Sequence, residues 1–96
     1  MEPANSEISI SDVVVSRAGR DQGEWFYVID AADTYLLLVN GKDRPLDKPK
    51  RKKRKHAQLV LRSETRVAAK LKSGDKVLNG ELRRDLAFLA REFASE

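Results

Sequence analysis

The sequence predicts a small, mainly β domain, in the form of a five-stranded barrel, followed by a C-terminal extension of one or two helices. Short runs of β-branched and aromatic residues recur at close intervals between turn-forming residues over 10–61. Alanine, leucine and charged helix formers replace them over 62–96. Ninety-six residues correspond to one domain. Residues 1–9 are mostly polar, and we expect them to form a disordered lead.

The expected strands follow from β-branched and aromatic runs bounded by turn signals. Three of them are predicted on this basis at residues 13–16, 25–29 and 35–39, and a short strand over 57–61 follows from its turn-like spacing from the others. The strand over 25–29 is apolar on both faces, which indicates a central position. Asn40-Gly41 is a strong hairpin signal, because both residue types tolerate positive φ. The hairpin also predicts a brief strand over 44–46, which is the fourth of five in chain order. It is expected at an edge of the sheet, because Pro45 cannot donate a ladder hydrogen bond.

Trp25, Phe26 and Tyr27 are adjacent aromatic residues in the expected central strand. Side chains alternate across a strand, so Trp25 and Tyr27 share one face and Phe26 takes the other. Aromatic residues stack on bases in many RNA-binding proteins. Three in a row in a central strand are more typical of a core, and we interpret them as core residues.

Two helices are expected after residue 62. Ser63 is a candidate cap for a helix that ends at Lys72, and Asn79 for a longer one through Phe93. Apolar side chains of the second helix fall on one face, at Leu82, Leu86, Leu89 and Phe93. This face either packs on the domain's own barrel or, as an alternative, docks on a protein partner of the transcription or translation machinery.

Positive charge is concentrated in one part of the chain. Residues 42–56 contain nine Lys or Arg against two Asp, whereas the other 81 residues contain ten Lys or Arg against thirteen Asp or Glu. A localised basic surface on a mildly acidic body is typical of nucleic-acid binding. Two other interpretations stay open: a solvated loop that only maintains solubility, and a nuclear-import signal over 49–55.

The segment Val13-Val-Val-Ser-Arg-Ala-Gly-Arg-Asp-Gln-Gly-Glu-Trp-Phe-Tyr-Val28 resembles the KOW motif of ribosomal proteins and transcription elongation factors. Together with the Asn-Gly turn and the Lys-Pro-Lys-rich run ending in Lys-His, residues 10–58 are similar to small bacterial KOW-domain RNA-binding proteins. Those proteins are relatives of archaeal and eukaryotic large-subunit ribosomal proteins. The resemblance implies an SH3-like five-stranded β-barrel that binds RNA, chiefly ribosomal RNA.

Two features depart from the family pattern. Ala57-Gln58-Leu59 is bulkier than the family pattern after the basic run, and the helical tail is longer than a KOW domain needs.

The resemblance and the charge pattern together define a candidate RNA-binding set. The motif glycine corresponds to Gly23, the loop over 17–24 is expected to set the register on folded RNA, and 48–55 to clamp the phosphate backbone. The alternative for Asp21 is an ion pair with an arginine of the same loop. The predicted RNA-binding residues are Arg17, Gly19, Arg20, Gln22, Gly23, Lys42, Arg44, Lys48, Lys50, Arg51, Lys52, Lys53, Arg54, Lys55 and His56.

Other functional classes find little support in the sequence. The chain has no cysteine and one histidine, His56, and no nucleophile lies at a recognisable spacing from a base. We therefore expect a non-catalytic protein without cofactor, metal or small-molecule substrate. The N-terminus is polar and acidic, and no apolar run reaches the ~18–20 residues of a membrane span. These features predict a cytoplasmic protein without a membrane partner, and the resemblance to KOW proteins implies that it is ribosome-associated.

Overall fold

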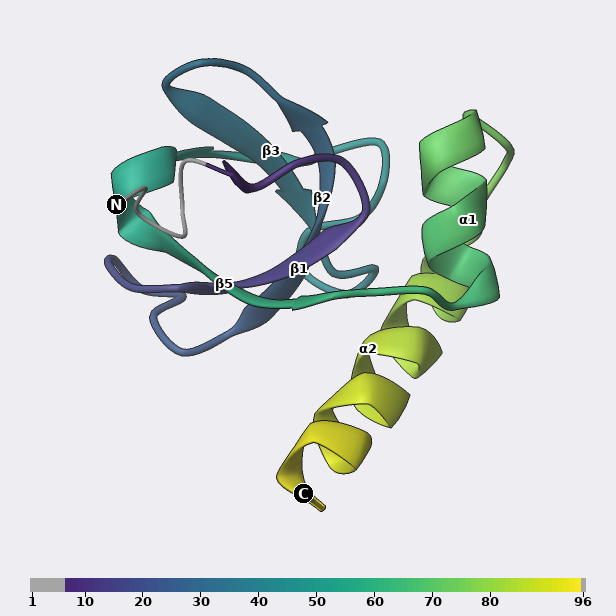
Figure 1. The fold of residues 1–96 in the computed structure, drawn as a ribbon. Coiled ribbons are helices and arrows are strands. Elements are labelled where there is room, and N and C mark those ends of the chain that lie inside the picture. Colours follow the sequence, from purple (N-terminus) through teal and green to yellow (C-terminus); the bar gives the residue numbers. More distant parts are fainter. Residues whose placement is uncertain (1–6, 96) are drawn as a thin grey trace.

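A computed structural model of the chain describes residues 7–95 and shows an antiparallel sheet followed by two helices (Figure 1). This arrangement confirms a mainly β fold with a helical C-terminal extension. Most of the expected lead lies outside the described residues. The strands are β1 (Asp12–Ser16), β2 (Trp25–Ala31), β3 (Tyr35–Val39), β4 (Lys50–Lys53) and β5 (Ala57–Arg62). The helices are α1 (Arg66–Ser73), α2 (Asn79–Ala94) and the short 3₁₀ helix η2 (Arg54–His56).

The sheet has the strand order β4-β3-β2-β1-β5, and each neighbouring pair is antiparallel. β1 pairs with β5, which follows η2 in the chain. In the part of the chain that the structure describes, β4 and β5 form no ladder, so the sheet is open. Closure into a barrel is therefore not seen.

The fourth strand differs from the prediction. It lies at Lys50–Lys53, within the expected basic loop, and pairs with β3 in the register Leu38↔Lys50 to Tyr35↔Lys53. Residues 44–46 form no strand, because Asn40 Oδ1 accepts the backbone N–H groups of residues 42 and 44 and folds this segment into a loop. The chain therefore reaches β3 again only after a second turn, closed by the bond from Lys48 N to Pro45 O.

Side-chain alternation gives the sheet two apolar faces. One face buries Val14, Phe26, Leu36 and Leu38 in a cluster inside the bent sheet. The opposite face carries Tyr27 and neighbouring apolar residues, which pack against the two helices. The predicted division of the aromatic residues is confirmed, since Phe26 belongs to the first cluster and Tyr27 to the second.

α2 covers the second face of the sheet. Leu82 and Leu86 are buried there, and Leu89 packs against the same cluster. Packing on the domain's own sheet is thus confirmed for this part of the apolar stripe. Phe93 remains 50% exposed and meets Trp25 edge to face, with the ring centroids 5.4 Å apart. Among residues 7–95, no helix has both the length and the apolar character needed to cross a membrane.

The helix caps differ from the expected residues. Thr65 caps α1 by accepting the Ala68 N–H, whereas the Ser63 hydroxyl lies 2.8 Å from the Tyr27 hydroxyl. Asn79 is already helical, and its Oδ1 accepts the backbone N–H of Leu46. Both polar side chains that we expected to cap their own helices therefore make tertiary contacts instead.

A partly buried polar cluster fixes the helices to β2. The Tyr27 hydroxyl donates to Asp85 Oδ2 on α2, and the Thr65 hydroxyl donates to the same oxygen over 2.9 Å. Burial, followed by the hydrogen bond to Asp85, raises the pKa of Tyr27 above its usual range. The phenol stays protonated and keeps its hydrogen bond to α2.

Candidate nucleic-acid interface

The loop over 17–24 is a compact turn between β1 and β2. Gly23 N donates to Ser16 O over 2.8 Å, and Gln22 N donates to Gly19 O over 3.2 Å. Gly19 and Gly23 have φ of 86° and 91°, a region that other residues rarely adopt. A Cβ on Gly23 would meet nothing within 4 Å, so its requirement is one of backbone conformation. Gln22 is exposed at the same turn.

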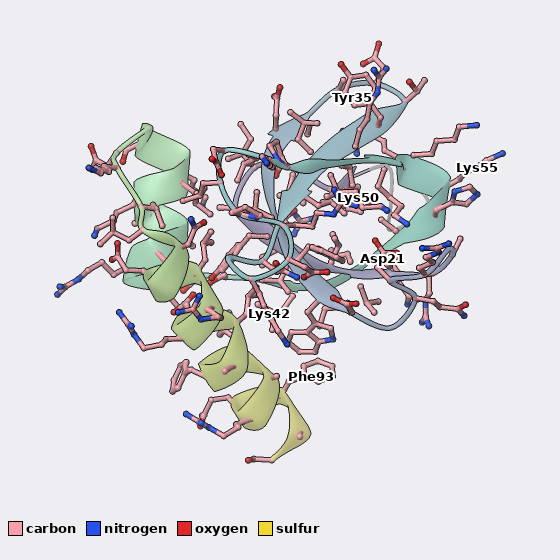
Figure 2. All side chains as sticks on the ribbon, turned by 180° about the vertical axis from the view of Figure 1, so that it is seen from behind. Asp21, Tyr35, Lys42, Lys50, Lys55 and Phe93 are labelled. Carbon is pink, nitrogen blue, oxygen red and sulfur yellow. The ribbon has the colours of Figure 1, made fainter. Side chains whose placement is uncertain are left out.

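Asp21 joins this loop to β4. Its Oδ1 accepts from Ser16 Oγ at 2.7 Å and from Lys52 Nζ at 2.9 Å, while Lys50 Nζ lies 3.3 Å from Oδ2. Lys52 also donates to Ala18 O and is only 7% exposed. Figure 2 shows Lys50 beside Asp21. Asp21 thus pairs with two lysines of the basic tract, and the expected alternative pairing with an arginine of its own loop is not seen.

Strand alternation divides the basic tract. Lys50 and Lys52 point to the side of Asp21, whereas Arg51 and Lys53 are exposed on the other side. The guanidinium of Arg51 lies 3.8 Å from the centroid of the Tyr35 ring, which is a cation–π contact. Lys52 is therefore a structural residue, and the exposed charge of β4 comes from Arg51 and Lys53.

η2 places a further set of cations beside the loop. Arg54 is held by the backbone, with Nε donating to Ala32 O and Nη1 to Ile8 O. Lys55 is exposed and projects away from the helices (Figure 2). His56 is half-buried, and its backbone oxygen accepts the N–H of Arg17 over 2.8 Å. This bond places the loop directly beside η2.

The two arginines of the loop are exposed. Arg17 Nε donates to Gln58 Oε1 at 2.6 Å, and Arg20 forms no ion pair within residues 7–95. The backbone bond from Arg17 N to His56 O joins the loop to η2, which carries Lys55 and directly follows Lys53. Arg17, Arg20, Lys53 and Lys55 are therefore exposed cations on neighbouring segments. We refer to these four residues as the cationic end.

The remaining predicted cations lie elsewhere. Lys42, Arg44 and Lys48 belong to the loop between β3 and β4, and Leu46 N of this loop donates to Asn79 Oδ1 at the start of α2. Gly41 O accepts from Arg83 Nη1 over 3.0 Å, which fixes this loop to the helix. Figure 2 shows Lys42 near α2 and Lys55 at the opposite end. The structure therefore brings together only part of the predicted set.

The contacts of Asp21 predict a pH-dependent stability. Burial alone would raise the pKa of Asp21, but hydrogen bonds from Ser16 and Lys52 outweigh it and lower the pKa from 3.8 to about 2. A depressed pKa stabilises the fold above pH 4, and this stabilisation is lost as the pH falls toward 2. Between pH 5 and pH 2 we expect the chain to lose about 2 kcal/mol more unfolding free energy than Asp21→Asn. Urea unfolding at both pH values measures this difference, and equal losses would contradict the role of Asp21.

Sequence reasoning missed two contributors to this region. Ser16 and Gln58 orient Asp21 and Arg17, and neither belonged to the predicted set. Asp21 is the only acidic side chain among residues 17–23, and this isolated carboxylate was the feature of the sequence that indicated an ion pair with the lysines of the basic tract.

Among the described residues, no three His, Asp or Glu side chains are grouped so as to hold a metal ion. No protein-family model matches the sequence, and no curated protein matches it either.

Proposed function

We propose that this chain is a non-catalytic RNA-binding protein that contacts structured RNA through the cationic end. The observation that supports this proposal is the placement of four exposed cations on two adjacent, well-anchored segments. Within residues 7–95, Arg20, Lys53 and Lys55 form no ion pair, so their positive charges face the solvent. Phosphates are the complementary ligands of such a surface.

The proposal includes an SH3-like KOW barrel as the fold. The strand order β4-β3-β2-β1-β5 and the 3₁₀ helix between β4 and β5 support it, as does the apolar cluster inside the bent sheet. On this basis we propose large-subunit ribosomal RNA as the ligand and a ribosome-associated, cytoplasmic role. The resemblance of residues 10–58 to KOW proteins supports this choice of RNA.

The buried ion pair between Lys52 and Asp21 supports the framework of the proposed surface. Lys52 is neutralised by Asp21, so it contributes little to phosphate attraction and instead fixes the loop over 17–24 against β4. The exposed cations are then presented on a preformed framework. A rigid arrangement of charges recognises the spacing of phosphates and 2′-hydroxyls in folded RNA without reading base edges.

The experiment that tests this function is a binding titration at several salt concentrations. Fluorescence anisotropy of a labelled RNA hairpin is expected to show binding at roughly 50 mM salt and much weaker binding at roughly 200 mM, because bound phosphates release counterions. Absence of binding at the lower concentration would contradict the proposal.

A protein-interaction role is the second candidate. Leu78, at the start of α2, is 56% exposed, and Phe88, further along the helix, is 45% exposed. Neither side chain belongs to the clusters that cover the sheet. Such apolar side chains suit a protein partner. Binding to a protein through these residues would survive high salt, whereas phosphate contacts would not.

A further inference from the structure

A groove of about 280 Å³ lies between the sheet and the last turns of α2. Its aromatic walls are Trp25 of β2 and Phe93 of α2, and Val15 and Val60 line its apolar surface. Phe93 is half exposed, so aromatic surface is open to a flat ligand. Figure 2 shows Phe93 toward the C-terminal end of α2.

The polar side of the groove is formed by Arg17 and Gln58. Arg17 Nε can only donate, so the hydrogen bond of 2.6 Å fixes the oxygen of the Gln58 amide toward Arg17. The terminal nitrogens of the guanidinium and the NH₂ group of Gln58 then have no hydrogen-bond partner within residues 7–95. This side of the groove therefore offers hydrogen-bond donors, which suit a ligand with acceptors.

We propose that the groove binds one unstacked nucleobase of the RNA, with guanine preferred. This inference rests on the proposed RNA binding, and it adds a base-recognition site to a surface that otherwise contacts phosphates. The O6 and N7 atoms of guanine are two adjacent acceptors that suit the two terminal nitrogens of an arginine. Adenine places the donor N6–H₂ beside N7, so it would bring a donor against donors.

Continuity with the cationic end favours a nucleotide over an apolar peptide or a second copy of the chain. Arg17 lines the groove and is also one of the four residues of the cationic end. Its backbone N–H donates to His56 O of η2. A nucleotide whose base enters the groove therefore has its phosphates near Arg20 and Lys55. An apolar occupant would leave the donors of Arg17 and Gln58 without partners, which costs binding energy.

The single tryptophan of the chain, Trp25, provides a direct probe of the groove. We expect a short uridine RNA with one central guanine to quench Trp25 fluorescence and to bind roughly ten-fold more tightly than the same RNA with a central adenine.

Phe93→Ala should weaken this binding by about ten-fold, because it removes a stacking surface. Phe88→Ala is the matched control, since Phe88 is 45% exposed on the same helix and does not line the groove. Arg17→Lys keeps the charge and should abolish the preference for guanine.

Several outcomes would overturn this inference and leave the proposed function standing. One is salt-dependent RNA binding that leaves Trp25 fluorescence unchanged, with Phe93→Ala equal to Phe88→Ala. Another is a Trp25 response to an uncharged apolar peptide, or self-association that Phe93→Ala removes, combined with no response to RNA bases. Failure to bind any RNA at low salt would instead contradict the proposed function itself.

Discussion

Changing Arg20, Lys53 and Lys55 together to alanine is expected to weaken the binding of structured RNA by roughly a hundred-fold at moderate salt. All three side chains are exposed and lie outside the clusters that stabilise the sheet, so the fold should be retained. Each lost phosphate contact also removes the release of one counterion. Fluorescence anisotropy with a labelled RNA hairpin measures the change, and circular dichroism checks that the variant is folded.

A matched control uses three exposed cations of the helical extension. Changing Lys72, Lys76 and Arg91 to alanine alters the net charge by the same amount but leaves the cationic end intact. We expect this control to retain most of the affinity. Equal losses in the two triple variants would show that only the net charge matters, and they would contradict a localised interface.

Changing Gly41 to alanine is expected to reduce the unfolding free energy by about 3 kcal/mol or more. Gly41 has φ of 76°, and a Cβ there would collide with the Asn79 carbonyl oxygen and lie 3.0 Å from Leu82 Cβ. The loop after β3 and the first turn of α2 would have to separate, which also breaks the bond from Arg83 to Gly41 O. Urea or thermal unfolding measures this effect.

Gly23→Ala is the control for this substitution. Gly23 also has a positive φ, 91°, but a Cβ there would meet no atom within 4 Å. Only the backbone cost of about 1–2 kcal/mol should apply. If Gly41→Ala were no more destabilising than Gly23→Ala, the close contact between the loop and α2 would be wrong.

The elements that local patterns determine were predictable. β1, β2 and β3 carry β-branched or aromatic residues, and both faces of β2 are buried as its composition indicated. The apolar stripe of α2 also identified its packing face at Leu82 and Leu86. In these segments propensity and burial favour the same structure.

β4 could not be predicted, because its sequence Lys-Arg-Lys-Lys has no apolar pattern. It forms a strand since β3 offers a free edge and since Lys52 finds a buried partner in Asp21, which lies far away in the sequence. The division of the cations between two ends of the molecule has the same cause. Asn40 folds the following segment into a loop that contacts α2, so Lys42 lies apart from Lys55.

The salt dependence of RNA affinity tests the central claim most directly. Four exposed cations at the cationic end predict that log affinity falls with log salt with a slope of about −3 to −4. The variant that lacks Arg20, Lys53 and Lys55 should show a slope that is shallower by about 2 to 3. An unchanged slope in that variant, or no RNA binding by the native chain even in dilute buffer, would contradict an RNA interface at this end of the molecule.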